Sequence, residues 1–382
     1  MCNNKRMEKI GILGGTFNPV HVEHVRIAKC AVEELGLDKL LIMPTFMPPH
    51  KSTAPAPAKD RIKMLELAFS NQDKIEISDY EIEKQGKSYT YLTVEHFKKL
   101  TGAHLYFIVG GDMLVDFKNW RYPERVLACA DLAVFGRDEF FADFEKEREY
   151  FKTRFNKDYV RLNYTGKNFS STKIRIYSVF SLPLDGLVPK AVENYIKENG
   201  LYGGNLYIDF VKDRLPQKRV KHTADVVITA LKKAKFLGLD EQKVITAAAL
   251  HDCAKYIDAS KVNGFSVDKD VPRQVVHQFL GAFIAQNYLG VDDVEILDAI
   301  RYHTSGKPQM STLGKLIFVA DMVEEGRNYE GVEYLRQLYE KDDFDFCFKE
   351  CLKEELLHLE NKGETIYEKT RLAYEYYDKQ ER

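Results

Sequence analysis

Two groups of histidines could do chemistry in this chain of 382 residues. The first lies in GGTFNPVHVEH, residues 14–24, where His21 and His24 follow a Gly-Gly pair. The second group contains four histidines and two aspartates: His222, His251, Asp252, His277, His303 and Asp321. Imidazole can donate hydrogen bonds to phosphate oxygens or, together with carboxylates, bind a transition metal. The spacing and the neighbouring residues of each group indicate whether it contacts phosphate or binds a metal.

The first group has the surroundings of a phosphate site. The apolar stretch KIGILGG runs into the Gly-Gly pair, and a helix is expected soon after, with His21 and His24 on one face of its first turn. Glycine lets a phosphate approach the backbone, and free N–H groups at a helix start attract anions. The patterns H-E-x-x-H, G-x-G-x-x-G and Walker A do not occur in this stretch. We therefore predict phosphate contact; a metal site and an ordinary surface histidine are the alternatives.

The second group has the composition of a metal site. Its six residues end or interrupt five apolar helical segments. Imidazole combined with carboxylate suits Fe, Mn, Zn or Co. A single histidine on an apolar helix is more often a core residue, but four histidines with two aspartates are not all expected to be structural. His251 and Asp252 are neighbours that would point about 100° apart on a helix, so this pair alone does not define a chelate.

The chain divides into two halves with different patterns. Short apolar strands alternate with amphipathic helices up to about residue 200, which predicts a parallel sheet with helices on both faces. The expected strands are 9–15, 39–45, 74–82, 104–111, 131–137 and 159–164. Beyond Gly203 and Gly204 only helices are expected. We predict an α/β domain, 1–203, and an all-α domain, 204–382, whose charged end from residue 331 is predicted only to be helical.

Composition limits the partners and the compartment. The formal net charge of −2 offers no overall basic field for long nucleic acid. No run of about 18 apolar residues occurs, so no membrane partner is expected, and the start of the chain lacks the apolar segment of a signal peptide. Six cysteines without a C-x-x-C pattern fit a reducing cytoplasm. The expected location is cytoplasmic, and a homo-oligomer is compatible with these features.

The first half resembles a known family of enzymes. GGTFNPVHVEH is similar to the signature of the nucleotidyltransferases with an H-x-x-H motif. MPTFMPPHK, KSYTYLTVEH, FIVGGDMLVDFKNW, FGR, NFSSTKIR and VPKAVENYIKENGLYG follow in the order found in bacterial nicotinate-mononucleotide adenylyltransferase. The resemblance covers residues 7–203 and implies a Rossmann-like fold. It also implies transfer of AMP from ATP, with Mg²⁺ on the triphosphate, to nicotinate mononucleotide, giving nicotinate adenine dinucleotide and pyrophosphate in NAD biosynthesis.

The same resemblance implies roles for individual residues. His21 and His24 would meet the ATP phosphates, with His24 on the α-phosphate, and Arg175 would act with them. Trp120 would stack on the pyridine ring, with Thr90 nearby contacting the carboxylate. The other implied substrate contacts are Gly14, Gly15, Thr16, Phe17, Lys51, Gly110, Asp112, Arg137, Ser170 and Thr172. Catalysis in this family needs no protein nucleophile, because positioning and charge stabilisation suffice.

Some of these assignments have plainer alternatives. Trp120 could be a core residue, Asp112 a helix cap and Lys51 a solvated lysine. Asn18 is acceptable where the family has Asp or Asn. Glu23 departs from the pattern, since the family usually has glycine between the two histidines. Its negative charge would oppose a triphosphate unless the side chain points away, which puts the packing of that helix in question.

The second half resembles the HD-domain phosphohydrolases. KRVKHTADVV, AALHDCAKYI, VVHQFLGA and AIRYHTSGKPQMSTLGKLIFVADMVEEGR are similar to bacterial symmetrical diadenosine-tetraphosphate hydrolases over residues 206–330. The resemblance implies that the six residues of the second group bind two metal ions, iron being the expected metal, with Asp252 also catalytic. It implies that Lys255 and Arg327 contact substrate phosphates, for which ordinary surface charge is the alternative.

The implied second reaction splits a dinucleoside polyphosphate, diadenosine tetraphosphate, into two molecules of ADP. The chain would then be bifunctional. Two alternatives apply to the second half, namely another nucleotide phosphohydrolase activity or a metal-binding regulatory module without turnover. For the first half, nicotinamide mononucleotide is the alternative acceptor.

Overall fold

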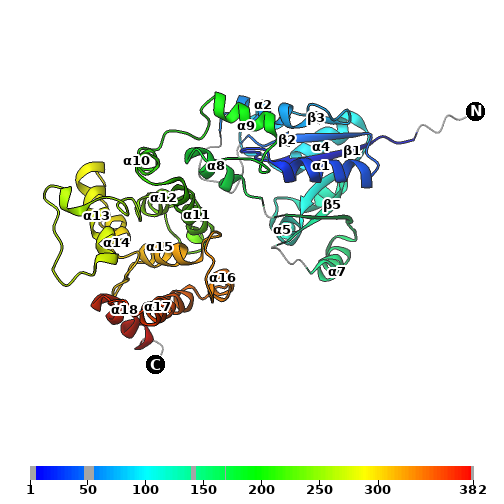
Figure 1. Ribbon diagram of the computed structural model, residues 1–382. Helices are drawn as coiled ribbons and strands as arrows, with labels where there is room; N and C mark the ends of the chain where they lie inside the picture. Colours follow the sequence, from blue (N-terminus) through cyan, green and yellow to red (C-terminus); the bar gives the residue numbers. More distant parts are fainter. Residues whose placement is uncertain (1–5, 47–55, 139–142, 168, 380–382) are drawn as a thin grey trace, which may run out of the picture. The chain divides into compact units, whose positions relative to one another are not determined.

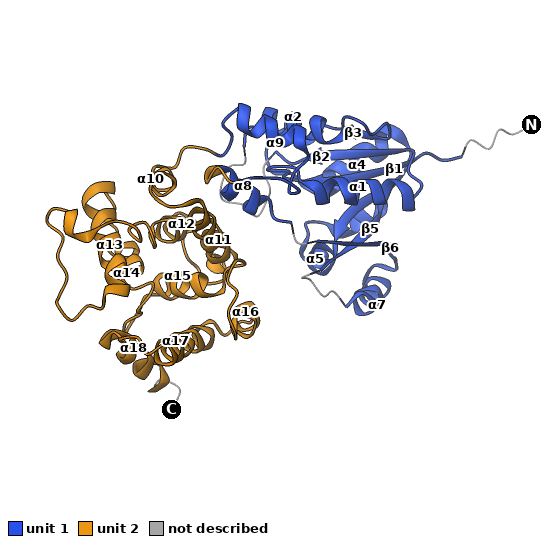
Figure 2. Cartoon of the chain, viewed as in Figure 1, with its two compact units in different colours: residues 1–178, 183–202 blue, residues 179–182, 203–382 orange. Residues whose placement is uncertain are grey.

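The computed structural model describes residues 6–46, 56–138, 143–167 and 169–379. These residues form two compact units (Figure 2). Unit 1 contains the described residues up to 178 together with 183–202, and unit 2 contains 179–182 and the described residues from 203 onward. The segment 179–182 therefore belongs to the second unit, although the domain division predicted above places it in the first.

Unit 1 is built on a six-stranded parallel sheet in the order β3-β2-β1-β4-β5-β6 (Figure 1). Its strands are β1 Lys9–Gly15, β2 Lys39–Pro44, β3 Ile75–Ile77, β4 His104–Gly110, β5 Ala130–Arg137 and β6 Val160–Gly166. The chain winds outward from β1 to β3 and then returns to place β4 on the other side of β1. Ligands of open α/β sheets bind beyond the carboxyl ends of the strands at such a switch point.

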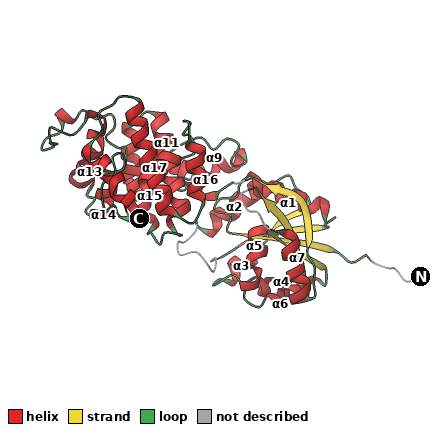
Figure 3. Cartoon of the chain, turned by 90° about the horizontal axis from the view of Figure 1, so that it is seen from below, coloured by secondary structure: helices red, strands yellow, loops and turns green. Residues whose placement is uncertain are grey.

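Helices cover both faces of this sheet, with α1 on one face and α4 and α6 on the other (Figure 3). The helices of unit 1 are α1 Val22–Glu34, α2 Ala58–Phe69, α3 Tyr80–Lys84, α4 Thr90–Thr101, α5 Gly111–Asp116, α6 Pro123–Cys129, α7 Phe144–Phe155, α8 Ser171–Val179 and α9 Lys190–Glu198. The strand expected over 74–82 is wrong beyond Ile77. Ser78 and Asp79 favour a turn there, and α3 follows.

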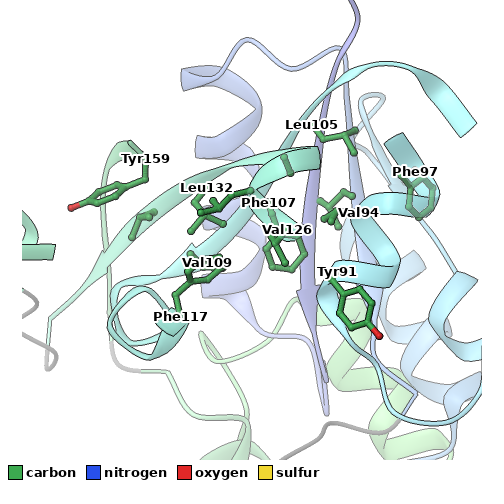
Figure 4. Packing of buried hydrophobic residues seen from close by; sticks show 14 of the residues in the cluster. Tyr91, Val94, Phe97, Leu105, Phe107, Val109, Phe117, Val126, Leu132 and Tyr159 are labelled. Carbon is green, nitrogen blue, oxygen red and sulfur yellow. The ribbon is translucent and has the colours of Figure 1, made fainter. Parts of the chain in front are cut away.

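The core on the α4 side of the sheet is rich in aromatic residues (Figure 4). Phe107 on β4 and Phe117 in the short 3-10 helix η1, Phe117–Asn119, pack with Val94 of α4 and Val126 of α6. The ring of Phe117 lies 5.3 Å from that of Phe151, so α7 is part of this core. Burying a side chain of this size stabilises the fold by about 1.5–3 kcal/mol. This packing anchors η1 and therefore the following residue, Trp120.

Unit 2 contains only helices among its described residues (Figure 3). They are α10 Leu206–Arg214, α11 Gln217–Ala234, α12 Glu241–Leu250, α13 Val276–Leu289, α14 Val294–Arg301, α15 Thr312–Val323, α16 Val332–Glu340, α17 Phe344–Asn361 and α18 Glu368–Asp378, with the 3-10 turns η2 Ala259–Lys261 and η3 Arg273–Val275. The apolar helix α15 packs against α11, α12 and α14 and also against α16 and α17. The charged end of the chain is therefore part of the folded unit. Across the described residues, none of the helices is both long enough and apolar enough to cross a membrane.

Replacement of Phe117 by alanine tests the aromatic core. Phe117 is fully buried, so Phe117→Ala should lower the free energy of unfolding of unit 1 by about 3–5 kcal/mol. Urea denaturation can be followed by the fluorescence of Trp120, the chain's only tryptophan, which lies in unit 1. Leu100→Ala is the control, since Leu100 is 68% exposed and its loss should change the stability by less than about 0.5 kcal/mol. A loss below about 1 kcal/mol for Phe117→Ala would contradict this account of the core.

Candidate active sites

His21 and His24 cap the helix that follows β1. His21 is the N-cap of α1, so the prediction that it lies within the first helical turn is wrong; the backbone stays extended until Val22. The His21 Nδ1 atom accepts a hydrogen bond from the backbone N–H of His24, and the His24 Nδ1 atom accepts one from the N–H of His21. The two rings stack with centroids 3.6 Å apart. The H-x-x-H spacing is therefore that of a reciprocal capping box.

These hydrogen bonds determine what the two imidazoles can offer. Burial lowers the pKa of His21 to about 4, against the opposing charge of Glu23, and it lowers the pKa of His24 well below its usual value. Both rings are therefore neutral near pH 7. Because each Nδ1 accepts a hydrogen bond, the proton of each neutral ring is on Nε2. Two N–H donors are suited to phosphate oxygens, whereas a metal would need an unprotonated nitrogen.

Glu23 points away from the two histidines. Its buried carboxylate accepts hydrogen bonds from the Tyr164 hydroxyl at 2.7 Å and the Lys167 backbone N–H at 3.0 Å, and it pairs with Arg26 at 2.5 Å. Burial opposes ionisation, but these hydrogen bonds outweigh it and lower the pKa of Glu23. The departure from glycine at this position is therefore accommodated by the end of β6, where Gly166 leaves room for the carboxylate.

Two arginines, the buried Arg61 and the half-buried Arg175, hold the loop after β1. Arg61, which is 1% exposed, donates from Nη1 to the backbone carbonyls of Thr16 and Thr45. Arg175 donates from Nη1 to the carbonyl of Asn18 at 2.8 Å and from Nη2 to the Thr172 hydroxyl. The predicted residues at the start of α8 are therefore joined to the loop that holds the histidines. Sequence analysis missed Arg61, because an arginine on an amphipathic helix usually indicates a solvated face.

Further predicted residues lie at the carboxyl ends of neighbouring strands. Gly110 ends β4 and Arg137 ends β5, and Arg137 Nε lies 3.4 Å from Asp112 Oδ1. A Cβ atom at Gly110 would come within 2.4 Å of that carboxylate oxygen, so the close approach requires glycine. Asp112 lies in the first turn of α5 rather than at its cap, which is Gly110. Because the strands are parallel, these groups share one edge with Gly14 and Gly15.

The predicted nicotinate contacts are only partly described. Thr90 is the first residue of α4. Trp120 follows η1 and is half-buried, with its ring 5.1 Å from that of Phe117 and 6.1 Å from that of Phe107. Trp120 therefore packs against the aromatic core and is also partly exposed, where a ligand could reach it. Lys51 lies outside the described residues.

The six residues of the second histidine group come together in unit 2. His222 comes from α11, Asp321 from α15 and His277 from the first turn of α13, while the other three directly follow α12 and α14. Asp252 Oδ1 lies 3.2 Å from His277 Nε2 and 3.4 Å from His303 Nε2. His222 Nε2 lies 3.0 Å from Asp321 Oδ1. Two sets of three could each hold a metal ion, namely His222, His251 and Asp321, and His251, Asp252 and His303.

The histidines of this cluster have the opposite arrangement of ring nitrogens from His21 and His24. The Nδ1 atoms of His251, His277 and His303 lie 2.6, 2.9 and 2.8 Å from the backbone carbonyls of residues 248, 274 and 300. A carbonyl only accepts, so each Nδ1 carries the proton and each Nε2 presents a lone pair to the aspartates. Hydrogen bonding at Nδ1 is how proteins orient metal-binding histidines.

Burial leaves part of this cluster without a partner. His251 is fully buried, and its Nε2 atom has no hydrogen-bond partner among the described residues. Burial lowers the pKa of His251 to about 3, so the ring is neutral. For Asp252 burial opposes ionisation, but the imidazoles of His277 and His303 beside its carboxylate, together with Lys255, outweigh it and hold the pKa well below its usual value. An unpartnered nitrogen lone pair facing two carboxylates fits a divalent metal ion.

Other residues complete the cluster. Glu324, 3% exposed, lies with Oε1 3.1 Å from Nδ1 of His222, and Arg219 donates to Asp252 Oδ2 at 3.0 Å. Sequence analysis missed both residues, because a glutamate or an arginine in a helical segment usually lies on the solvated surface. Lys255 Nζ lies 3.4 Å from Asp252 Oδ1, and Arg327 binds the Asp321 carboxylate and its backbone carbonyl. Lys255 and Arg327 are therefore paired with aspartates of the cluster and are not ordinary surface charges.

Comparison with known proteins matches the two halves of the chain to two different families. Residues 12–176 match the cytidylyltransferase-like family, and residues 219–326, which include the whole histidine cluster, match the HD domain. A Mycoplasma genitalium protein named "Probable nicotinate-nucleotide adenylyltransferase/Ap4A hydrolase" is 30% identical over 85% of this chain and 89% of its own length. The chain belongs to the nicotinate-nucleotide adenylyltransferase family. The predicted fold class, a Rossmann-like α/β part followed by an all-α HD part, is confirmed.

Members of the nicotinate-nucleotide adenylyltransferase family also match the first half alone. A Clostridium tetani protein named "Probable nicotinate-nucleotide adenylyltransferase" is 40% identical over 51% of this chain and 100% of its own length. A crystal structure from Clostridium acetobutylicum, described as a predicted HD superfamily hydrolase involved in NAD metabolism, covers 45% of this chain and 95% of its own, with 29% identity and a TM-score of 0.43. The first half of this adenylyltransferase chain thus matches a relative over that relative's whole length.

Replacement of Glu23 by glutamine tests its structural role. Glu23→Gln should destabilise unit 1 by about 1–3 kcal/mol at pH 7, because buried donors lose a charged acceptor. The folded-state pKa of Glu23 lies below its ordinary value of 4.5, so its contribution is complete above about pH 4.5 and is lost as the pH falls through the folded-state pKa. The difference in urea midpoint between wild type and variant should therefore shrink from pH 7 to pH 3. Glu33→Gln, an exposed change on the same helix, should have no such effect, and a pH-independent difference for Glu23→Gln would contradict the assignment.

Proposed function

We propose that this chain is a bifunctional enzyme. Its first domain, 1–203, would transfer AMP from ATP to nicotinate mononucleotide, and its second domain, 204–382, would hydrolyse diadenosine tetraphosphate to two molecules of ADP. The observation that carries the proposal is the opposite use of Nδ1 in the two histidine groups. His21 and His24 offer N–H donors, whereas His251, His277 and His303 offer lone pairs. The double name of the Mycoplasma genitalium relative supports the same pair of activities.

In the first reaction the phosphate of nicotinate mononucleotide attacks the α-phosphorus of ATP, and pyrophosphate leaves. We assign His24 Nε2–H to the α-phosphate and His21 Nε2–H to the neighbouring phosphates, while Arg175 binds their oxygens through its fork. Mg²⁺ accompanies the triphosphate as part of the substrate. The loop of Gly14 and Gly15 lets the nucleotide approach the backbone. Neutral donors held in place before binding need no reorganisation as charge develops on the phosphorus oxygens.

The other proposed contacts surround this centre. We assign the backbone of Thr16, Phe17 and Gly110 and the side chains of Asp112, Ser170 and Thr172 to ATP. Arg137 and Lys51 would add positive charge at the substrate phosphates. Thr90 and Trp120 would receive the pyridine ring of nicotinate mononucleotide. Nicotinamide mononucleotide is the competing acceptor, and a direct comparison of the two mononucleotides as substrates decides between them.

In the second reaction, the metal-binding residues would be His222, His251, Asp252, His277, His303 and Asp321. Divalent metal ions held by these residues, for which we propose iron, would supply positive charge for phosphate oxygens and would lower the pKa of a water molecule. Arg219 and Lys255 hold the Asp252 carboxylate in place, and Glu324 orients His222. Lys255 and Arg327 supply positive charge for the polyphosphate.

Replacement of His24 by alanine separates the two activities. His24→Ala should lower the rate of adenylyl transfer by about 100- to 1,000-fold, because one donor to the reacting phosphate is removed. Hydrolysis of diadenosine tetraphosphate by the same preparation should be unchanged. His104→Ala is the control, since His104 begins β4 at the opposite edge of the sheet. An equal loss of both activities in His24→Ala would contradict the two-site proposal.

Replacement of Asp252 tests the metal centre. Asp252→Ala should lower the content of bound transition metal, measured by elemental mass spectrometry, and reduce hydrolysis by at least about 100-fold while leaving adenylyl transfer intact. Asp268→Ala, an exposed change on the loop before α13, should retain metal and both activities. An unchanged metal content in Asp252→Ala would count against the ligand assignment. Retained metal without hydrolysis in the wild type would favour a regulatory module.

A further inference from the structure

A pocket in unit 2 adjoins the histidine cluster. It is lined by Lys255, Gln274, Val275, Thr304, Glu355, His358, Leu359, Glu364, Thr365, Tyr367 and Thr370. We infer that this pocket binds the nucleoside of a nucleoside diphosphate unit, with the Glu355 carboxylate as its main polar contact. The inference rests on the proposed hydrolase function and names a subsite for its substrate.

Lys255 and Thr304 form the wall that the pocket shares with the cluster. Lys255 Nζ lies 3.1 Å from Nε2 of His277, and the Thr304 hydroxyl lies 3.2 Å from the same nitrogen. The ammonium group of Lys255 therefore stands between the predicted metal ligands and the pocket. A phosphate held at the cluster would place the next part of the nucleotide inside the pocket.

The lining also contains acidic residues, and burial, with the nearby charge of Asp321, raises the pKa of Glu355 to about 7. Glu355 and Glu364 contribute carboxylates, and Lys255 is the only lysine or arginine in the lining. None of the described residues donates a hydrogen bond to the Glu355 carboxylate. Carboxyl oxygens accept hydrogen bonds, which suits the ribose hydroxyls or the amino group of a purine base. The positive group at the cluster end and the acidic residues elsewhere in the lining match the order phosphate, then nucleoside.

The size of the pocket fits one nucleoside part of the substrate. Its volume is about 200 Å³, and drug-sized ligands usually occupy about 300–1,000 Å³. A whole dinucleotide would therefore not fit. Val275, Leu359 and Tyr367 provide apolar surface for the face of a base.

The pocket connects the end of the chain to the cluster. Gln274 donates from its side chain to the Thr365 carbonyl at 2.7 Å, and its own carbonyl lies 2.9 Å from Nδ1 of His277. Gln274 therefore contacts both the segment before α18 and a predicted metal ligand. Residues of α17 and α18 lie beyond 326, where the match to the HD domain ends. The inference gives this part of the chain a role in substrate binding.

The test compares a nucleotide substrate with one that lacks a nucleoside. Steady-state kinetics of the full chain would be measured with diadenosine tetraphosphate and with bis(4-nitrophenyl) phosphate. Glu355→Ala and Glu355→Gln should raise KM for diadenosine tetraphosphate by about tenfold or more, the range expected for one lost buried hydrogen bond. The ratio of kcat/KM for the nucleotide to that for the nucleoside-free ester should fall by the same factor. Glu360→Gln, an exposed change on the same helix that does not line the pocket, should leave the ratio unchanged.

Equal losses on both substrates, or an unchanged KM for the nucleotide in both Glu355 variants, would overturn the inference. Photolabelling of the wild-type chain with 2-azido-ADP tests the pocket independently of turnover. Label should appear in peptides covering residues 355–370 and should be displaced by excess diadenosine tetraphosphate. Label confined to peptides before residue 203 would overturn the pocket assignment. A chain that takes label at 355–370 but does not hydrolyse diadenosine tetraphosphate would refute the proposed function and not the nucleoside site.

Discussion

The group that each histidine offers to a ligand depends on the hydrogen bond at its other ring nitrogen. In unit 1 the Nδ1 atoms of His21 and His24 accept backbone N–H groups, so the protons stay on Nε2. In unit 2 the Nδ1 atoms of three histidines face backbone carbonyls, so Nε2 is left as a lone pair. The same side chain thus serves as a phosphate donor in one proposed site and as a metal ligand in the other.

Burial strengthens this distinction. Desolvation lowers the pKa values of His21 and His251 far enough to keep both of these rings neutral near pH 7. At the second cluster the ionised Asp252 and Asp321 are surrounded by nitrogen atoms, with arginine or lysine groups on their outer side. His222 differs, because burial is outweighed by its hydrogen bonds to Asp321 and Glu324, and its pKa rises to about 9. A metal ion would replace that proton.

Buried charges also hold the backbone of the first site. Arg61 is enclosed by backbone carbonyls, which fix the loop after β1 to the segment after β2. Glu23 ties the start of α1 to β6. Truncating either residue would leave unpaired polar groups in the interior, which costs more than the loss of a surface contact. The position of the two histidines therefore depends on residues that touch no substrate in the proposed reaction.

The amino-acid sequence by itself determined the two fold classes, most of the strands and helices, and the two sets of histidines. These follow from the period of apolar residues and from short motifs, which are local properties of the chain. The sequence did not indicate where Glu23 points, because its partner Tyr164 lies 141 residues away. Nor did it indicate the carbonyl or N–H group at each Nδ1, the burial of Arg61, or the pocket formed by α17 and α18 beside the cluster. Only the tertiary structure decided the direction of Glu23, the burial of Arg61 and the pocket, because each depends on the distance between atoms from separate elements. The contacts at Nδ1 are made three residues away along the chain, so they depend on the local backbone and side-chain conformation that only the structure shows.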